Sequence, residues 1–246
     1  MWALFAREVH RFRKLWLDTV ISPIVSTALY LSVFGIVVGG IMVGNVDYLA
    51  FVYVGLLGMM MINSSFSNPA FSLIIAKNVG NIIDLQLIPV AAWRIGLAYA
   101  LAALVRALVT VAIALTFTIW FIPGMAVHHI FYLLFGMFVT GVQFGILGVV
   151  FGMKAKNFEA LTFMTTFILQ PMIFLAGVFY PISQLPGIWS RVAEFNPIHH
   201  NINILRYATV GYSDASPLVS VAVMLGVTVV LFTVMHFVTK KSIHSF

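Results

Sequence analysis

The sequence has 246 residues, of which 62% are hydrophobic and only 8% are charged. Because a soluble domain carries roughly 25% charged residues, this composition excludes a soluble fold and indicates a single membrane domain over residues 1–246. The net charge of +6 comes from basic residues grouped between apolar runs, which is typical of membrane orientation rather than nucleic-acid binding, and the lack of cysteine excludes disulfides and thiolate chemistry.

The first segment, residues 1–17, is predicted to be an amphipathic helix that lies in the membrane interface. Apolar side chains recur every three or four residues, and charged side chains fall on the opposite side of the helical wheel. The apolar positions are Trp2, Phe5, Val9, Phe12 and Trp16, and the charged positions are Arg7, Arg11, Lys14 and Asp18. Two roles are open: a topology anchor, or a cuff against a cytoplasmic partner.

Six membrane-spanning helices are predicted from the positions of the charged residues. A bilayer core about 30 Å thick requires roughly 20 apolar residues in a helix, because backbone amides must bond internally there. Charges therefore mark the ends of spans. The predicted spans are residues 19–43, 48–68, two within 95–153, 161–180 and 218–239, with a turn at Gly44 and Asn45 and a break at Pro123, Gly124, His128 and His129. The expected fold class is an all-α polytopic membrane protein.

Six spans place both termini and the loops 69–94 and 154–159 on one side of the membrane. That side carries ten basic residues: Arg7, Arg11, Arg13, Lys14, Lys77, Arg94, Lys154, Lys156, Lys240 and Lys241. The other side carries Arg191 and Arg206. By the positive-inside rule the first side is cytoplasmic. A cleaved signal peptide is not expected, since no small-residue cleavage pattern follows the first apolar run.

The stretch from Gly177 to Pro217, between the last two spans, is too long for a turn and too aromatic for a free loop. Prolines at positions 181, 186, 197 and 217 divide it into pieces of about one short helix each. Two short re-entrant helices that dip into the outer leaflet would satisfy both properties.

Motifs of an enzyme or a nucleotide-binding subunit are missing. The sequence contains no GxxxxGK[ST], HExxH or GxSxG motif and no intramembrane pair of carboxylates. We therefore expect neither catalysis nor a bound cofactor in this chain, so that any nucleotide would be handled by another subunit.

Two adjacent histidine pairs, His128 with His129 and His199 with His200, invite a metal-site interpretation. Neighbours in sequence point apart on a helix, and no carboxylate stands at ligand spacing. Structural roles are favoured, and no metal is expected.

Arg106 is the only charged residue between Ile95 and Met153 and is a candidate intramembrane polar site. Structural pairing, which includes snorkelling toward the interface, and a role in lining a pathway are both open. In the predicted fourth span, glycines at 136, 141, 145, 148 and 152 are most simply explained by close helix packing, with a translocation path as the alternative.

Two segments together resemble a known family. They are the segment NIIDLQLIPVAAWRIGLAYALAALVRAL and the segment GVFYPISQLPGIW, which is followed by FNP and NINILRYATVG. Both are similar to segments of the ABC-2 type permeases, the membrane subunits of ATP-binding-cassette exporters. The resemblance covers nearly the whole chain: an interfacial helix, six spans, a cytoplasmic coupling helix in the loop 69–94, and outer re-entrant helices in 177–217.

The resemblance assigns roles to individual residues. Asp84 and Pro89 hold the positions of the family's acidic residue and proline in the coupling region, and Leu85 and Leu87 lie beside them in the loop expected to dock into the ATPase. Arg106 matches a basic residue often found in the third span. The outer motif maps onto Gly177, Phe179, Tyr180, Pro181, Leu185, Pro186, Asn196, Pro197 and Arg206, with Asn203 resembling the bacterial YadH-type branch. His199 and His200 depart from the apolar or aromatic residues common there.

The mechanism that the resemblance implies is alternating access. A separate ATPase dimer, which binds ATP and Mg, would close and push the coupling helices, so that two permease halves rearrange around a midplane path. One chain with six spans implies two permease copies, most simply a homodimer, with two ATPase subunits in a bacterial inner membrane.

The expected function is export of an amphiphile, such as a lipid, a lipid-linked glycan or a hydrophobic drug. An ion-coupled secondary transporter is the alternative, although such carriers usually show intramembrane acids and repeated broken helices. An intramembrane enzyme and a silent assembly factor are further alternatives. The identities of the substrate and of the ATPase do not follow from the sequence.

Overall fold

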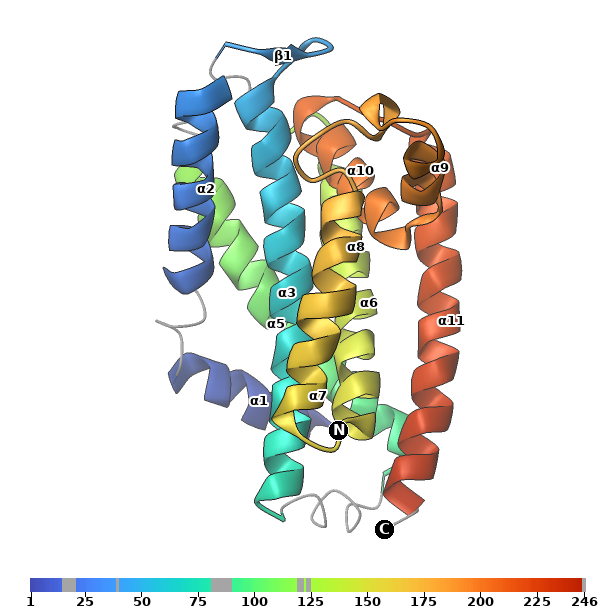
Figure 1. Cartoon of the computed structure of the whole chain (residues 1–246). Helices are drawn as coiled ribbons and strands as arrows, with labels where there is room; N and C mark the ends of the chain where they lie inside the picture. The colour runs from blue at the N-terminus through green and yellow to red at the C-terminus, as the bar shows by residue number, and fades with distance from the viewer. Residues whose placement is uncertain (15–20, 39, 81–89, 119–121, 123–124, 245–246) are drawn as a thin grey trace.

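The structure, a computed structural model, describes residues 1–14, 21–38, 40–80, 90–118, 122 and 125–244. These residues form an elongated helical bundle with a small β-hairpin at one end, the hairpin end, and both termini near the other, the termini end (Figure 1). The elements are α1 (Trp2–Lys14), α2 (Ser22–Val38), β1 (Met42–Val43), β2 (Val46–Asp47), α3 (Tyr48–Asn78), α5 (Ala92–Thr118), α6 (Ile130–Lys154), α7 (Phe158–Phe163), the π-helix η2 (Met164–Leu169), α8 (Gln170–Leu175), the 3-10 helix η3 (Ile182–Gln184), α9 (Ile188–Phe195), α10 (Pro197–Val210) and α11 (Pro217–His244).

Five helical segments of the described chain are long and apolar enough to cross a membrane. They are α3, α5, α6, the continuous segment Phe158–Leu175 formed by α7, η2 and α8, and α11. Helix α2 is also apolar but shorter, with 17 residues. A multi-pass helical membrane protein is therefore confirmed, whereas the sixth span depends on α2 and stays a prediction.

The connection between α2 and α3 is a two-stranded hairpin rather than the end of a helix. Residues 42–43, expected in the first span, form β1, which pairs with β2 in antiparallel register. The predicted turn at Gly44 and Asn45 is confirmed, and Gly44 adopts a φ of +59° that a side chain would disfavour. Asp47 then caps α3 by accepting a hydrogen bond from the Leu49 amide at 2.8 Å.

Helix α3 is ten residues longer than the predicted span 48–68, so that residues 69–78, assigned to the coupling loop, are helical. Pro69 lies inside the helix without ending it. The extension persists because Leu73 and Ile74 are fully buried in the bundle, and because Lys77 donates to the backbone carbonyls of Met153 and Ala155 at the end of α6. The helix thus continues to the first charged residue after Asp47, which is Lys77.

The fifth segment also differs from its prediction, since it ends at Leu175 rather than near Tyr180. Gly177 adopts a φ of +82°, which terminates the helix in a left-handed turn. The carbonyls of Gly177 and Val178 are thereby released from the helix and accept hydrogen bonds from Arg206. Between the third and fourth predicted spans, α6 begins at Ile130, directly after His129, so that the predicted break is confirmed; Pro123 and Gly124 lie outside the described residues.

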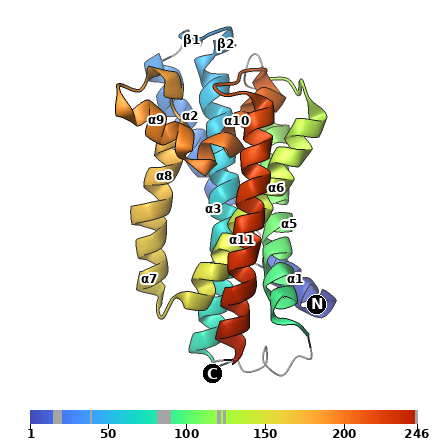
Figure 2. The same cartoon turned by 90° about the vertical axis from the view of Figure 1, so that its right-hand side faces the viewer.

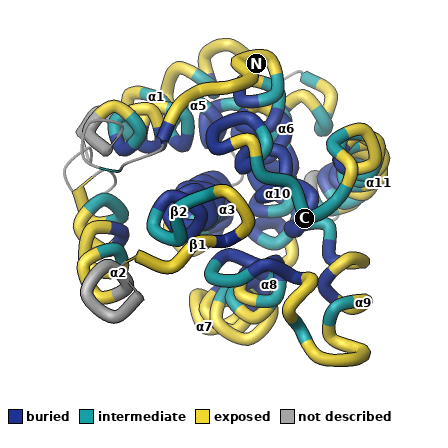
Figure 3. The backbone as a smooth tube through the Cα atoms, turned by 90° about the horizontal axis from the view of Figure 1, so that it is seen from above, coloured by how far each residue is buried: buried dark blue, intermediate teal, exposed yellow. Residues whose placement is uncertain are grey.

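Helix α3 is the centre of the bundle and packs against α2, α5, α6 and α10 (Figure 3). In its most apolar window 83% of the residues are buried, against 17% for α11 and 17% for the segment Phe158–Leu175. The two peripheral segments therefore expose apolar side chains such as Phe167, Val229 and Phe237. In a membrane protein such faces meet lipid or another subunit.

Glycines on α6 allow the neighbouring helices to approach closely, as the glycine stripe predicted. A Cβ atom at Gly148 would lie 2.3 Å from the Phe66 carbonyl oxygen of α3, and one at Gly145 would lie 2.9 Å from the Ala100 carbonyl oxygen of α5. Similar contacts surround Gly136, Gly141 and Gly152. Their absent side chains set the spacing between α6 and its neighbours.

Helix α1 lies within the predicted interfacial helix 1–17, and its charged side contacts the bundle. Arg7 and Arg11, on the predicted charged side, donate to the Tyr99 hydroxyl at 2.8 Å and to the Ser72 hydroxyl at 2.7 Å. The reason is Glu8, which is buried and requires partners: it accepts a hydrogen bond from Ser72 and pairs with both arginines. Trp2 remains 78% exposed on the apolar side. Residues 15–20 lie outside the described residues.

Candidate functional site

A cavity of about 290 Å³ lies between α2 and α3. Hydroxyl and amide groups share its wall with apolar side chains. It is lined by Ser22, Pro23, Ser26, Thr27, Tyr30, Leu56, Met59, Met60, Asn63 and Ser64. A more open depression continues along α2 at Ser26, Leu29, Tyr30 and Val33. A mostly apolar cavity with a few polar groups is the usual form of a small-molecule site.

The polar wall of this cavity comes from the hydroxyl side chains of α2 and from Asn63 and Ser64, which begin a run of polar residues in the middle of α3. Residues 63–68 read NSSFSN and interrupt an otherwise apolar helix. Leu56, Met60 and Ser64 follow one another at intervals of four residues and so share one face, which changes from apolar to polar toward the termini end. On α2 the same interval separates Ser22, Ser26 and Tyr30.

Arg106 lies one step beyond this polar run. Its Nη1 donates to the Asn68 side-chain oxygen at 3.3 Å, while its Nε is buried without a hydrogen-bond partner. Among the residues that the structure describes, Arg106 forms no ion pair. The sequence left open whether Arg106 is structurally paired or lines a pathway. Its pairing is present but incomplete, because its Nε has no partner.

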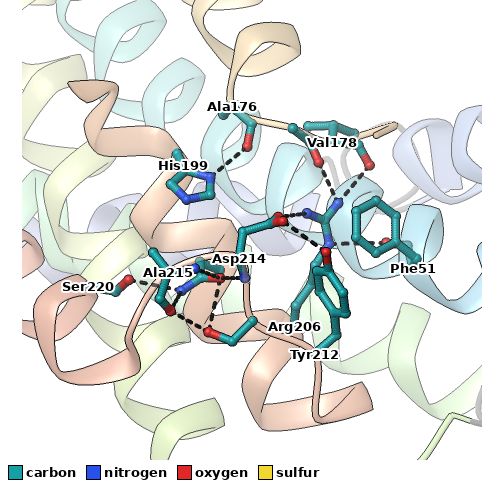
Figure 4. Close-up of polar contacts among 12 residues, drawn as sticks. Phe51, Ala176, Val178, His199, Arg206, Tyr212, Asp214, Ala215 and Ser220 are labelled. Atoms are coloured by element: carbon teal, nitrogen blue, oxygen red, sulfur yellow. Dashed lines mark hydrogen bonds and ion pairs between the residues drawn. The ribbon is translucent and has the colours of Figure 1, made fainter. Parts of the chain in front are cut away.

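A second arginine, Arg206 of α10, is fully buried near the hairpin end (Figure 4). Its Nη2 donates to the carbonyls of Gly177 at 2.6 Å and Val178 at 2.9 Å, and its Nε donates to the Phe51 carbonyl at 3.3 Å. Its Cζ lies 3.6 Å from the centroid of the Phe51 ring, in a cation–π contact. Nη1 lies 3.9 Å from Asp214 Oδ2. This guanidinium joins α3, the turn after α8, α10 and the loop before α11.

Asp214, the acid of this pair, is positioned by its own loop. Asn203 accepts a hydrogen bond from the Asp214 amide at 2.8 Å and donates to the Ala215 carbonyl and to the Ser220 hydroxyl. Burial raises the pKa of the Asp214 carboxyl above its ordinary value, and burial, together with the Asp214 charge, raises the pKa of Tyr212 to about 12. Tyr212 therefore stays protonated and donates to Asp214 Oδ1 at 2.9 Å.

The predicted outer motif is brought together here as a structural unit. Asn196 caps α10 through the Ile198 amide and donates to the Met172 carbonyl, and Pro197 is the first residue of that helix. Phe179 accepts a hydrogen bond from the Tyr48 hydroxyl, and Tyr180 donates to the Phe174 carbonyl. Pro181 precedes η3, which ends at Leu185, and the Pro186 carbonyl accepts from the Trp189 amide. Figure 2 shows α10 beside the upper part of α11, with α9 at the same end of the bundle.

The histidine pairs have structural partners. His199 faces the Ala176 carbonyl at 3.3 Å, and His200 lies between the Ser220 hydroxyl and the Glu194 carbonyl, although the two rings approach to 5.3 Å. His128 contacts the Thr209 carbonyl, and His129 stacks on Tyr207. No group of three or more potential metal ligands occurs in the described part of the chain.

The predicted coupling residues Asp84, Leu85, Leu87 and Pro89 lie outside the described residues, so that their role stays a prediction. The described flanks show that α3 ends at Asn78 and α5 begins at Ala92. The end of α3 and the beginning of α5 both lie at the termini end, where α1 also packs against α5 (Figure 1).

Some residues of these sites were missed by sequence reasoning. Asp214 had a usable signal, since it is the only acid after Glu194 and follows Arg206 in the chain. Phe51 and Glu8 had none, because a phenylalanine in an apolar helix and an acid in an amphipathic helix are ordinary there. The polar run 63–68 was visible as a polar interruption of a predicted span.

These observations first define a class: a multi-pass helical membrane protein with a lined cavity between two of its helices. A family model for the ABC-2 type transporter matches residues 1–210, and the chain belongs to this family.

The chain is also similar to two named bacterial proteins. The chain is 31% identical over 233 residues to the inner membrane transport permease YadH of Escherichia coli (strain K12), covering 94% of this chain and 90% of that protein. It is 28% identical over 246 residues to nodulation protein J of Rhizobium meliloti (strain 1021), covering 91% and 85%. The chain is therefore the membrane subunit of an ABC transporter in an inner membrane; it is not itself catalytic, and the ATPase is a separate subunit.

Proposed function

We propose that this subunit exports an amphiphile, such as a lipid, a lipid-linked glycan or a hydrophobic drug, at the expense of ATP hydrolysed by its partner. The observation that carries the proposal is the cavity between α2 and α3. Its serine, threonine and tyrosine hydroxyls suit a polar headgroup, whereas Leu56, Met59 and Met60 suit an apolar chain. Methionine side chains adapt to ligands of different shape.

Access to the cavity from the membrane is supported by the exposed side of α2. Val25, Leu29 and Val33 are at least half exposed, and the depression beside them shares Ser26 and Tyr30 with the cavity. An amphiphile could thus enter sideways from the lipid without passing through water. The same exposed side of α2 leaves room for a second copy of the chain, and we propose a homodimer surrounded by lipid.

The proposed orientation places the termini end in the cytoplasm, where two ATPase subunits bind ATP and Mg. Basic residues at that end support it, since Lys77, Lys154, Lys240 and Lys241 lie in the last turns of their helices. The loop that contains Asp84, Leu85, Leu87 and Pro89 would receive the ATPase stroke and move α3 and α5. An ion-coupled mechanism has less support, because the only acid within the five candidate spans is Glu159, an exposed residue near the start of α7.

Ser26→Phe tests whether the cavity is the transport site. The larger ring should fill the space between α2 and α3 and reduce amphiphile-stimulated ATP hydrolysis by about tenfold, equivalent to about 1.4 kcal/mol. The measurement uses the chain reconstituted with its ATPase in proteoliposomes, with stimulation and transport recorded together.

Ser32→Phe is the matched control. Ser26 and Ser32 both lie on α2, are exposed, and donate to the carbonyl four residues earlier, but only Ser26 lines the cavity. Ser32→Phe should stay close to the wild type. Equal effects of the two substitutions, or no effect of either, would reject the cavity as the substrate site.

A further inference from the structure

Arg106 and Arg206 differ in how well the protein satisfies them. Arg206 has three carbonyl acceptors and an aromatic face, and its Nη1, which makes no hydrogen bond, lies 3.9 Å from the Asp214 carboxylate. Arg106 has the neutral Asn68 amide oxygen at 3.3 Å, and its Nε is buried without a partner. Within the described residues, no carboxylate lies within 4.0 Å of Arg106. An unpaired charge inside a span is costly, so the position requires a compensating group.

The position of Arg106 connects it to the cavity. Asn68 follows Ser64, a cavity-lining residue, by four positions on α3, which is about 6 Å along the same helical face. On α5, Leu104 and Ala107 flank Arg106 and pack in the same apolar cluster as Ile24 of α2. The guanidinium therefore lies beyond the end of the cavity that faces the termini end.

The chemistry at this point favours an anion. A guanidinium binds phosphate or carboxylate through two parallel hydrogen bonds, and Asn68 can donate through the amide nitrogen that Arg106 does not use. Glu8, the buried acid of α1, is already shared between Arg7, Arg11 and Ser72. It therefore does not neutralise Arg106, which leaves the negative charge to be supplied by a ligand.

We propose that Arg106 and Asn68 bind the anionic headgroup of the amphiphile, a phosphate or a carboxylate, while its apolar part occupies the cavity between α2 and α3. This inference rests on the proposed function, because it specifies the class of amphiphile. Snorkelling of Arg106 toward water would hydrate its Nη atoms but would still leave the buried Nε without a partner.

The test compares lipid binding by the purified full-length chain in neutral detergent, with native mass spectrometry as the readout. Phosphatidylglycerol, phosphatidylcholine and inorganic phosphate are offered separately and in competition. The wild type should retain the anionic phosphatidylglycerol about tenfold better than phosphatidylcholine. Arg106→Gln should abolish this preference, and Arg106→Lys should keep part of it.

Two further variants keep the test decisive. Arg94→Gln removes the same charge near the start of α5, on an exposed residue outside the cavity, and should leave the preference unchanged. Asn68→Ala keeps the charge of Arg106 and should weaken the preference by about threefold, which provides a measurement even if Arg106→Gln does not fold.

The outcomes separate the alternatives. A preference that survives in Arg106→Gln, or falls equally in Arg94→Gln, overturns the site, as does a wild type without preference. Displacement of phosphatidylglycerol by inorganic phosphate at millimolar concentration would show a free-anion site and overturn the assignment to an amphiphile. Because the assay contains no ATPase, a lost preference would leave the proposed export function standing, and a failed transport assay would leave a measured preference standing.

Discussion

Arg206 illustrates how a single buried charge organises its surroundings. The carbonyls of Gly177 and Val178, released where the fifth segment ends, are its acceptors, and Asp214 is its counter-ion. Removing one partner of a buried pair leaves the other desolvated and uncompensated, which costs far more than the pair contributes in net terms. Gly55 belongs to the same arrangement, since a Cβ there would lie 2.3 Å from the Val178 carbonyl oxygen.

Arg206→Met should lower the free energy of unfolding by about 3 to 5 kcal/mol. The substitution leaves the Asp214 carboxylate without its counter-ion and three carbonyls without their donor. Thermal denaturation of the purified protein in detergent measures the loss. Arg191→Met removes an exposed arginine of α9 and should change stability by less than about 0.5 kcal/mol. Equal destabilisation by both would show that the Arg206 contacts do not hold the hairpin end together.

Among the elements, α6 depends on glycine for its packing against α3. Gly148 lies where the Phe66 carbonyl oxygen and Pro69 Cγ would stand 2.3 Å and 2.7 Å from an added Cβ. Backbone atoms of a helix cannot yield as a flexible side chain can, so a methyl group must push the two helices apart.

Gly148→Ala should therefore destabilise the bundle by about 1 to 3 kcal/mol, although alanine is the better helix former. Gly226→Ala provides the comparison, because Gly226 also lies inside a helix, α11, but has open space where the Cβ would be. That variant should be neutral or slightly stabilised. Denaturation of both variants in mixed micelles decides the matter: if Gly148→Ala is as stable as Gly226→Ala, then α3 and α6 are not in close contact.

For the whole molecule, both termini lie at one end of the bundle and α9 at the other (Figures 1 and 2). The proposed orientation places the termini in the cytoplasm. Because the natural chain has no cysteine, single cysteines report on orientation without a background. Trp2 and Phe195 suit this purpose, as they are 78% and 88% exposed at opposite ends.

Phe195→Cys should react with a membrane-impermeant maleimide in cells whose outer membrane is permeabilised, because the proposed orientation exposes α9 to the outer side. Trp2→Cys should react only after the cells are broken. The fraction labelled, read by gel shift, is the measurement, with the cysteine-free wild type as blank. The reverse pattern would invert the orientation and move the proposed ATPase site to the wrong side.

The sequence predicted more of the fold than of the contacts within the sites. Most spans were placed well because a charge cannot be buried in lipid cheaply, and charges therefore delimit helices. The end of α3 was misplaced because about 20 residues already span a bilayer, whereas the burial of Leu73 and Ile74 extends the helix to Asn78. The end of α8 was misplaced because local periodicity does not reveal that the carbonyls of Gly177 and Val178 leave the helix and accept hydrogen bonds from Arg206.

The sequence by itself determined the membrane class, the approximate spans and the glycine stripe of α6, since these depend on composition and on spacing within one helix. Only the tertiary structure decided which polar groups meet. Arg206 and Phe51 are 155 positions apart, and Arg106 and Asn68 are 38 apart. Such pairs form because neighbouring helices bring distant residues together. A buried charged group then interacts with polar groups that are close in space, whatever their separation in sequence.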